Sequence, residues 1–224
     1  MVSGPQHDDI VAKLEALIGE LHGDAPQVRK RRQILRAATE LFVAQGYRKT
    51  SVAEVANASG VAKGTVYLYY KTKTDLLFAA VAMEKLEFLD RFATLFDNDL
   101  PARVRLQSWV FGALTIASIA PLTARLLSGD RELAAVFADA PAAFVEAQRS
   151  EGDAMLAELV TEAAAPNEIP SAVIAARVRA LSVTLMTGPQ LHAMAAIRGP
   201  APDTLSEELT ELLLDGLTAP VRTP

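Results

Sequence analysis

The fold is decided by the segment Lys49-Thr-Ser-Val-Ala-Glu-Val-Ala-Asn-Ala-Ser-Gly-Val-Ala-Lys-Gly-Thr-Val-Tyr-Leu-Tyr-Tyr-Lys-Thr-Lys73. Ser51 stands three residues before Glu54, which is the capping-box spacing that starts a helix. At Ser59-Gly60 the glycine supplies the backbone freedom that a sharp turn needs. A second short helix is expected from Lys63 to about residue 69. The segment therefore predicts two short helices joined by a tight turn, a helix-turn-helix.

The second of these helices and its flank carry side chains that suit DNA. Lysine binds phosphates or guanine edges, and threonine and tyrosine hydroxyls donate to phosphates. The residues of this kind are Lys63, Thr65, Tyr67, Tyr69, Tyr70, Lys71 and Lys73. Two of them have plain alternatives, because Tyr70 is expected in the core rather than on DNA and Lys71 can be merely solvated.

Charge is distributed unevenly along the 224 residues, whose net charge is −5. Residues 28–75 hold ten Lys and Arg against three acidic residues, a balance of +7, and the remainder carries −12. A basic segment on an acidic body is typical of a nucleic-acid-binding module joined to another domain. The alternative is a solvated charged face.

A longer pattern resembles a known family. It consists of Arg32-Gln-Ile-Leu-Arg-Ala-Ala-Thr-Glu-Leu-Phe-Val-Ala-Gln-Gly-Tyr47, Thr50-Ser51, Gly60-Val-Ala-Lys-Gly-Thr-Val-Tyr67, Tyr70 and Lys73-Thr-Asp-Leu76. Over residues 30–78 it resembles the DNA-binding domain of TetR family transcriptional regulators. The family usually has Ser or Thr where this chain has Ala62, and losing such a cap costs a helix about 0.5–2 kcal/mol.

The resemblance implies where DNA is contacted. It places Lys63, Thr65 and Tyr67 near bases, and it implies that Lys73 caps the next helix and grips a phosphate. The expected phosphate ligands are Thr50, Ser51, Tyr67, Lys71 and Lys73. The full set of expected DNA-binding residues is Arg29, Arg32, Thr50, Ser51, Lys63, Thr65, Tyr67, Tyr69, Lys71 and Lys73.

The N-terminal extension, residues 1–27, is expected to be disordered to residue 7 and then to form an amphipathic helix from Asp8 to His22. This helix either packs on the protein's own body or serves dimer contacts or the DNA-binding surface. The cluster Arg29-Lys-Arg-Arg32 opens the next helix, where it can contact phosphates or reach a minor groove as a flexible arm.

The rest of the chain is expected to be helical, because no segment alternates with a period of two. One long helix, about residues 73–96, links the DNA-binding domain (28–75) to an effector-binding and dimerisation domain (76–219), with a disordered tail at 220–224. Further helices are expected at about 101–119, 121–128, 130–138, 140–164, 171–198 and 203–218. The chain is therefore predicted to be all-α, a three-helix head on a larger helical body.

The last two helices, 171–198 and 203–218, are the expected homodimer interface. The resemblance implies this pairing, and two heads related by symmetry read a palindrome better than one. The final helix carries the stripe Leu205, Leu209, Leu212, Leu213 and Leu217. Ordinary core burial is the alternative explanation of such a stripe.

An effector pocket is expected within the body. Aromatic and methionine side chains favour an apolar ligand, although such residues at helical spacing usually form core. The candidates are Phe88, Phe92, Phe96, Trp109, Phe144, Met155, Met186 and His192.

Several other classes of protein are disfavoured. There is no Cys, the three His residues are far apart, and no phosphate loop or nucleophile motif is present, so no metal, cofactor or enzymatic activity is expected. No signal peptide is visible, and prolines interrupt both long uncharged stretches, so a cytoplasmic protein outside the membrane is expected. The function predicted is a repressor released from a palindromic operator by a small, largely apolar ligand. The alternative is a helix-turn-helix protein whose body binds a protein partner.

Overall fold

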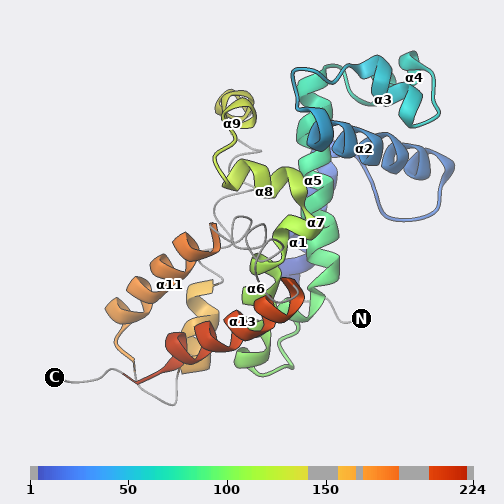
Figure 1. Ribbon diagram of the computed structural model, residues 1–224. Coiled ribbons are helices and arrows are strands. Elements are labelled where there is room, and N and C mark those ends of the chain that lie inside the picture. The colour runs from blue at the N-terminus through green and yellow to red at the C-terminus, as the bar shows by residue number, and fades with distance from the viewer. Residues whose placement is uncertain (1–4, 141–155, 165–168, 187–201, 221–224) are drawn as a thin grey trace.

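The computed structural model describes residues 5–140, 156–164, 169–186 and 202–220 (Figure 1). Every regular element within these ranges is helical, which confirms the predicted all-α class. Besides a helical segment at 156–164, the elements are α1 (Pro5–Ile18), α2 (Pro26–Gln45), α3 (Val52–Ala58), α4 (Lys63–Tyr69), α5 (Lys73–Arg91), the 3-10 turn η1 (Ala93–Phe96), α6 (Ala102–Leu114), α7 (Ile116–Ile119), α8 (Pro121–Leu127), α9 (Arg131–Ala138), α11 (Ser171–Met186) and α13 (Pro202–Thr218).

The head is built from α2, α3 and α4. Phe42 and Val66 are fully buried between these helices, and the ring of Tyr47 lies 5.7 Å from that of Phe42. Tyr70 is only 4% exposed, so the structure confirms its expected place in the core. This small core fixes α4 against α2 and α3.

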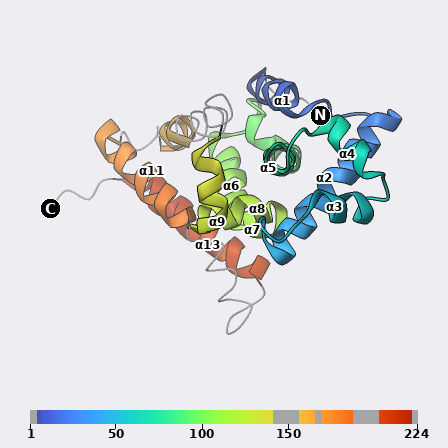
Figure 2. The same cartoon turned by 90° about the horizontal axis from the view of Figure 1, so that it is seen from above.

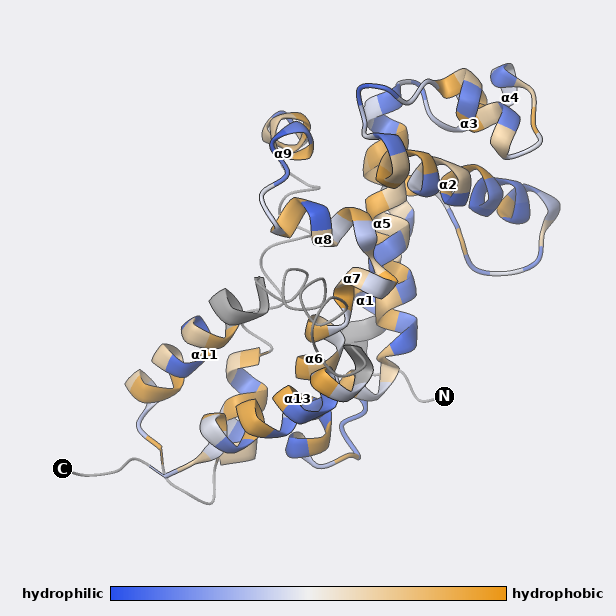
Figure 3. Cartoon of the chain, in the orientation of Figure 1, coloured by the Kyte–Doolittle hydropathy of each residue, from blue (hydrophilic) through white to orange (hydrophobic). Residues whose placement is uncertain are grey.

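Helix α2 begins earlier than expected, at Pro26. Proline suits a first helical position, because its fixed backbone angle matches the helix. The N–H that proline lacks would have no partner within the helix at that position. The cluster Arg29–Arg32 therefore lies one turn inside a helix, and the expectation of a flexible arm is wrong. These residues form the blue end of α2 in Figure 3.

Helix α5 joins the head to the body. It packs on α2 in the head and on α1, α7 and α8 in the body, and it runs through the middle of the molecule (Figure 1). It starts with the expected capping box, Thr72 with Asp75, and ends at Arg91 rather than at residue 96, because Phe92 leaves the helical conformation. The predicted domain boundary at 75/76 thus falls inside one continuous helix.

The N-terminal helix α1 packs on the protein's own body. Its buried residues Ile10, Leu14 and Ile18 face α5 and η1. The helix starts at Pro5, so the expected disorder of residues 5–7 is wrong, and it ends before Gly19, whose positive φ of 83° favours glycine. Of the two alternatives for this helix, packing on the body is confirmed.

The body differs from the expected helices at one clear point. The helix expected at 101–119 is divided into α6 and α7 by Thr115, whose hydroxyl donates to the carbonyl oxygen of Phe111 at 2.8 Å. Such a side-chain bond to the preceding turn competes with regular helix continuation. Residues 141–155 of the expected helix 140–164, and residues 187–198 of the expected helix 171–198, lie outside the described ranges.

Helix α13 turns an unexpected face to the core. Ser206, Thr210 and Leu214 are buried, and α13 packs on α6 and α11. Thr210 can be buried because its hydroxyl donates to the carbonyl oxygen of Ser206 at 2.7 Å. Of the predicted leucine stripe, Leu217 is buried and Leu209 and Leu213 pack against the core, whereas Leu212 is 69% exposed. The helices α11 and α13 lie at the end of the molecule away from the head (Figure 2).

None of the helices in the described ranges combines the length and the apolar character of a membrane-crossing segment.

Candidate DNA interface

Helix α3 is held by the capping box that the sequence predicts. The Glu54 amide donates to the Ser51 hydroxyl at 3.2 Å, and the Ser51 amide donates to the Glu54 carboxylate at 2.8 Å. Val55 is fully buried below this cap, and Gly60, with φ 69°, makes the turn into α4. Local sequence chemistry therefore sets the angle at which α4 leaves α3.

Helix α4 has no side-chain cap. Ala62 adopts the extended conformation of an N-cap residue, with φ −68° and ψ 145°, but offers no oxygen to the first amides of the helix. The helix is held instead from its middle and its end, by buried Val66 and by Tyr70. The departure from the family pattern thus has the structural consequence expected for it.

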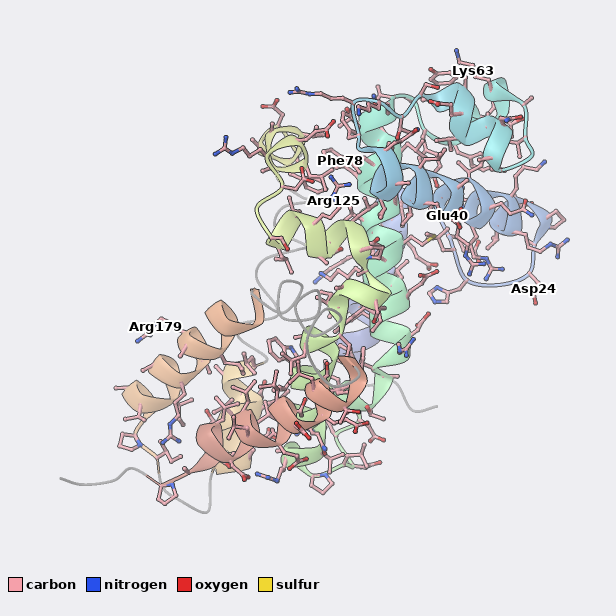
Figure 4. All side chains as sticks on the ribbon, in the orientation of Figure 1. Asp24, Glu40, Lys63, Phe78, Arg125 and Arg179 are labelled. Atoms are coloured by element: carbon pink, nitrogen blue, oxygen red, sulfur yellow. The ribbon has the colours of Figure 1, made fainter. Side chains whose placement is uncertain are left out.

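One face of α4 is open to solvent. Lys63, Gly64, Tyr67 and Leu68 are exposed on it, opposite buried Val66. The ammonium of Lys63 lies 5.9 Å from the centre of the Tyr67 ring, and Lys63 lies on the outer side of the head (Figure 4). An exposed helix face of lysine, tyrosine and a small residue fits a DNA major groove.

Leu68 was not predicted as part of this face, although it is 78% exposed. The missing signal was helical position: residues three or four apart share a face, so Leu68 lies with Gly64 and away from Val66. An exposed apolar side chain on this helix suits the methyl group of thymine. Thr65 and Tyr69, which were predicted, are half-buried at the margins of the face.

Two predicted phosphate ligands have partners inside the head instead. Thr50 is buried, and its hydroxyl donates to the carbonyl oxygen of Gly46 at 2.8 Å. The Lys73 ammonium donates to the carbonyl oxygens of Tyr47 at 2.9 Å and Thr50 at 3.0 Å, with Arg48 at 3.4 Å. These hydrogen bonds hold the loop between α2 and α3. In this structure backbone carbonyl oxygens, rather than phosphates, accept from the donors of Thr50 and Lys73.

The remaining predicted residues lie at the edges of the head. Ser51 and Lys71 are exposed, which leaves both able to meet a phosphate. Arg29 donates to the carbonyl oxygen of Asp24, and Arg32 to that of Gly23 at 2.9 Å. These two guanidinium groups therefore hold the loop before α2, and their contacts with DNA stay predictions.

The body contains an aromatic cluster close to the predicted effector pocket. The rings of Phe88 and Phe92 lie 4.8 Å apart, and the rings of Phe92 and Phe111 lie 6.5 Å apart. Gly112 makes this packing possible, since a Cβ atom there would lie 3.0 Å from both Phe88 and Phe92. A groove of about 470 Å³ opens beside the cluster, lined by Phe92, Gln107, Ser108, Phe111, Glu207, Thr210 and Glu211.

Among the predicted effector residues whose side chains the structure describes, Phe92 alone lines this groove. Phe96 is buried and Trp109 packs against the core. Phe144, Met155, His192 and the side chain of Met186 lie outside the described residues.

The head and body are joined through α8. The Arg125 guanidinium donates to the carbonyl oxygens of Phe42 at 2.9 Å and Val43 at 3.2 Å, at the end of α2. Figure 4 shows Arg125 between the body and this end of the head. The carboxylate of Glu132, in α9, accepts a hydrogen bond from the amide of Arg48, in the loop that follows α2.

At the opposite end of α8, buried Glu84 from α5 accepts the amides of Leu122 and Thr123, each at 2.9 Å. Burial raises the pKa of Glu84 to about 7, although these two amide hydrogen bonds act in the opposite direction. One short helix therefore connects the linking helix α5 to the end of α2.

Comparison with known proteins agrees with this geometry. Residues 34–80 match the family model described as "Bacterial regulatory proteins, tetR family". The fatty acid metabolism regulator protein of Bacillus subtilis is 34% identical over 104 residues, which are 46% of this chain and 48% of that protein. The matched part thus spans about half the length of this relative.

Two solved structures share the fold over nearly their whole length. The fatty acid degradation regulator FadR from Bacillus halodurans has a TM-score of 0.64 at 22% identity and covers 88% of this chain and 98% of its own. FadR from Bacillus subtilis in complex with stearoyl-CoA has a TM-score of 0.61 at 22% identity, covering 83% and 98%. At these identities the likeness shows the fold alone. Residues 34–80, which form most of the head, carry the DNA-binding domain described by the model of the TetR family of bacterial regulatory proteins.

Proposed function

We propose that the protein is a homodimeric transcriptional repressor that leaves a palindromic operator when a small, largely apolar ligand binds its body. The observation that carries the DNA-binding part is the exposed face of α4, with Lys63, Tyr67 and Leu68 opposite buried Val66. A helix presented in this way enters a major groove, and its lysine reaches a phosphate or a guanine edge. The cytoplasmic location expected from the sequence is consistent with this role.

Pairing through α11 and α13 follows from the exposed side of α13. Leu212 is 69% exposed, and Leu205 and Leu209 on the same face are half-buried. An exposed leucine beside half-buried ones favours an interface, and a two-fold axis there presents two heads to one operator.

The proposed effector site is the groove between α6 and α13. The rings of Phe92 and Phe111 suit an apolar ligand, and Glu207 and Glu211 stand among the lining residues. The Bacillus subtilis FadR structure holds stearoyl-CoA, which combines a long apolar chain with phosphates. In this chain the two carboxylates would repel phosphates, so we expect an apolar ligand without that head group.

Release of DNA then follows from a shift between two conformations. A ligand that binds one body conformation and DNA that binds the other oppose each other reciprocally, typically by about 1–3 kcal/mol. The hydrogen bond from Arg125 to the end of α2 connects the body directly to the head, so a change in the body can shift the head.

The test has two stages. The full chain is used to select bound duplexes from random DNA, and the selected operator is then titrated with protein in the presence of a library of apolar compounds. We expect a shared inverted repeat, and a subset of compounds that weakens binding to it. If no sequence is enriched, the proposal fails. If an operator emerges and only a protein partner weakens binding, the alternative function is favoured.

A further inference from the structure

Arg31 connects the N-terminal extension to the recognition helix. From the second turn of α2, its guanidinium donates to the carbonyl oxygen of Glu20 at 2.6 Å. The same group lies 5.1 Å from the centre of the Tyr69 ring, the last residue of α4. Tyr69 in turn lies beside buried Tyr70, with the ring centres 6.3 Å apart. One side chain therefore contacts both the turn after α1 and the end of α4.

Gly19 provides the space for this guanidinium. A Cβ atom built on Gly19 would lie 2.6 Å from the Cζ atom of Arg31 and 2.8 Å from each of its terminal nitrogens. No real Cβ atom tolerates such distances, so any larger residue at position 19 must displace the guanidinium. The turn at Gly19 and Glu20 thus forms a seat shaped for Arg31.

The seat is fixed to the body. Helix α1, which precedes it, buries Ile10, Leu14 and Ile18 against α5 and η1. The extension lies outside the family match at residues 34–80. A continuous series of contacts runs from the body through α1 and the seat to Arg31 and Tyr69.

We infer that Arg31 is a positioning residue for the recognition helix, holding Tyr69 and the end of α4 against the seat formed by Gly19 and Glu20 without contacting DNA itself. Cation–ring attraction holds the contact with Tyr69, and the hydrogen bond to Glu20 orients the guanidinium. Because Ala62 leaves the start of α4 without a cap, support at its other end has a larger effect on its orientation. The inference rests on the proposed function, since it concerns how that function's DNA-binding helix is oriented.

The test compares three variants of the full chain. Arg31→Met keeps the apolar stem and removes the guanidinium, and Gly19→Ala displaces the guanidinium without removing its charge. Gly23→Ala is the matched control, because Gly23 has a similar φ of 94° but no atom within 4 Å of the added Cβ. Affinity for the selected operator and for random DNA is measured over a range of salt concentrations, and amide exchange of α4 is measured without DNA.

We expect Arg31→Met and Gly19→Ala to weaken operator binding by about two- to thirtyfold, the range for losing one guanidinium–ring contact. The loss should spare random DNA, leave the salt dependence unchanged, and accompany faster amide exchange in α4. Gly23→Ala should match the unchanged chain in each of these measurements.

Three results would overturn the inference. In the first, Arg31→Met lowers the slope of log affinity against log salt concentration by about one, while Gly19→Ala binds the operator normally. This pair of results would make Arg31 a phosphate contact. Another is wild-type operator affinity in both variants. The third is unchanged amide exchange of α4, which decides the matter even if the chain binds no DNA and the proposed function fails by itself.

Discussion

Arg125 in the body donates a hydrogen bond to the carbonyl oxygen of Phe42 in the head, at 2.9 Å. Phe42 lies in the last turn of α2, and its carbonyl oxygen also accepts the amide of Gly46 at 3.0 Å. The same guanidinium binds Asp130 through its Nε atom, also at 2.9 Å, and Asp130 accepts the first amides of α9. One cation therefore joins α2, α8 and α9, and its removal tests how the body holds the head.

Replacing Arg125 by Gln should weaken both the fold and its regulation. The carbonyls of Phe42 and Val43 lose a charged donor, which should lower the free energy of unfolding by about 1–3 kcal/mol, given that the side chain is partly exposed. Effector and operator should also oppose each other less strongly. Urea unfolding and operator titration with and without effector measure the two effects, and exposed Arg179 changed to Gln is the control. Unchanged coupling would show that Arg125 transmits nothing.

Glu84 predicts a pH dependence of stability with a defined sign. Its pKa of about 7 in the folded protein lies above the ordinary value of 4.5, so the folded state keeps a proton that the unfolded state loses. This proton makes its full contribution to the free energy of unfolding below about pH 4.5. The contribution, a few kcal/mol at most, is lost as the pH rises to about 7. Glu84→Gln removes this titration.

The free energy of unfolding of the wild type minus that of Glu84→Gln should therefore fall between about pH 5 and about pH 7 and be level above that range. Urea unfolding across this range gives the difference directly, and contributions from other carboxyl groups cancel in it. A difference that rises with pH would mean that the hydrogen bonds from Leu122 and Thr123 outweigh burial.

Lys63 and Lys73 should behave differently although both are cations of the head. Lys63→Ala should weaken binding to the operator and lower the slope of log affinity against log salt by about one. Lys73→Ala should leave that slope unchanged and lower the stability of the head by about 1–3 kcal/mol, because carbonyl oxygens lose their donor. Binding titrations at several salt concentrations and thermal unfolding separate the two outcomes. A lower slope for Lys73→Ala would restore it as a phosphate ligand.

Ala62→Ser should supply the missing cap of α4. The backbone of Ala62 already has the extended conformation of an N-cap residue, so a serine hydroxyl can accept an amide of the first turn. We expect a gain of about 0.5–2 kcal/mol, visible as a higher midpoint of thermal unfolding and slower amide exchange in α4. Exposed Ala58 changed to Ser, at the end of α3, should give no such gain. An equal gain from both substitutions would show that the stabilisation does not come from capping α4.

Leu212→Asp should separate the proposed dimer. The side chain is 69% exposed in the single chain, so the substitution should leave the fold intact while burying a carboxylate in the interface. Sedimentation should show a dimer for the wild type and a monomer for the variant, with weaker operator binding. Leu127→Asp, at a 40% exposed leucine of α8, is the control. A variant that stays dimeric would move the interface away from this face of α13.

Short-range sequence chemistry predicted the head well. The capping boxes at Ser51 and Thr72 and the turn at Gly60 all depend on residues within four positions of one another. The uncapped start of α4 followed in the same way from Ala62. These features need no knowledge of the tertiary structure.

Features that depend on distant partners were not predicted. Lys73 binds carbonyl oxygens of residues 47, 48 and 50, and Arg125 reaches α2, more than 80 positions earlier. A basic residue reveals its charge in the sequence but not the carbonyls that will face it. The buried face of α13 was missed for a related reason, since Thr210 is buried only because its hydroxyl bonds to its own helix.

The most direct test of the central claim is to locate α4 on the bound operator. The chain has no cysteine, so Leu68→Cys, at a 78% exposed position of α4, carries an iron chelate that cleaves nearby DNA at one defined site. The account predicts two clusters of cleavage about one helical turn apart, near 10 base pairs, and none from the same chelate at Leu127→Cys. Bound operator that is not cleaved from position 68, or is cleaved equally from position 127, would contradict it.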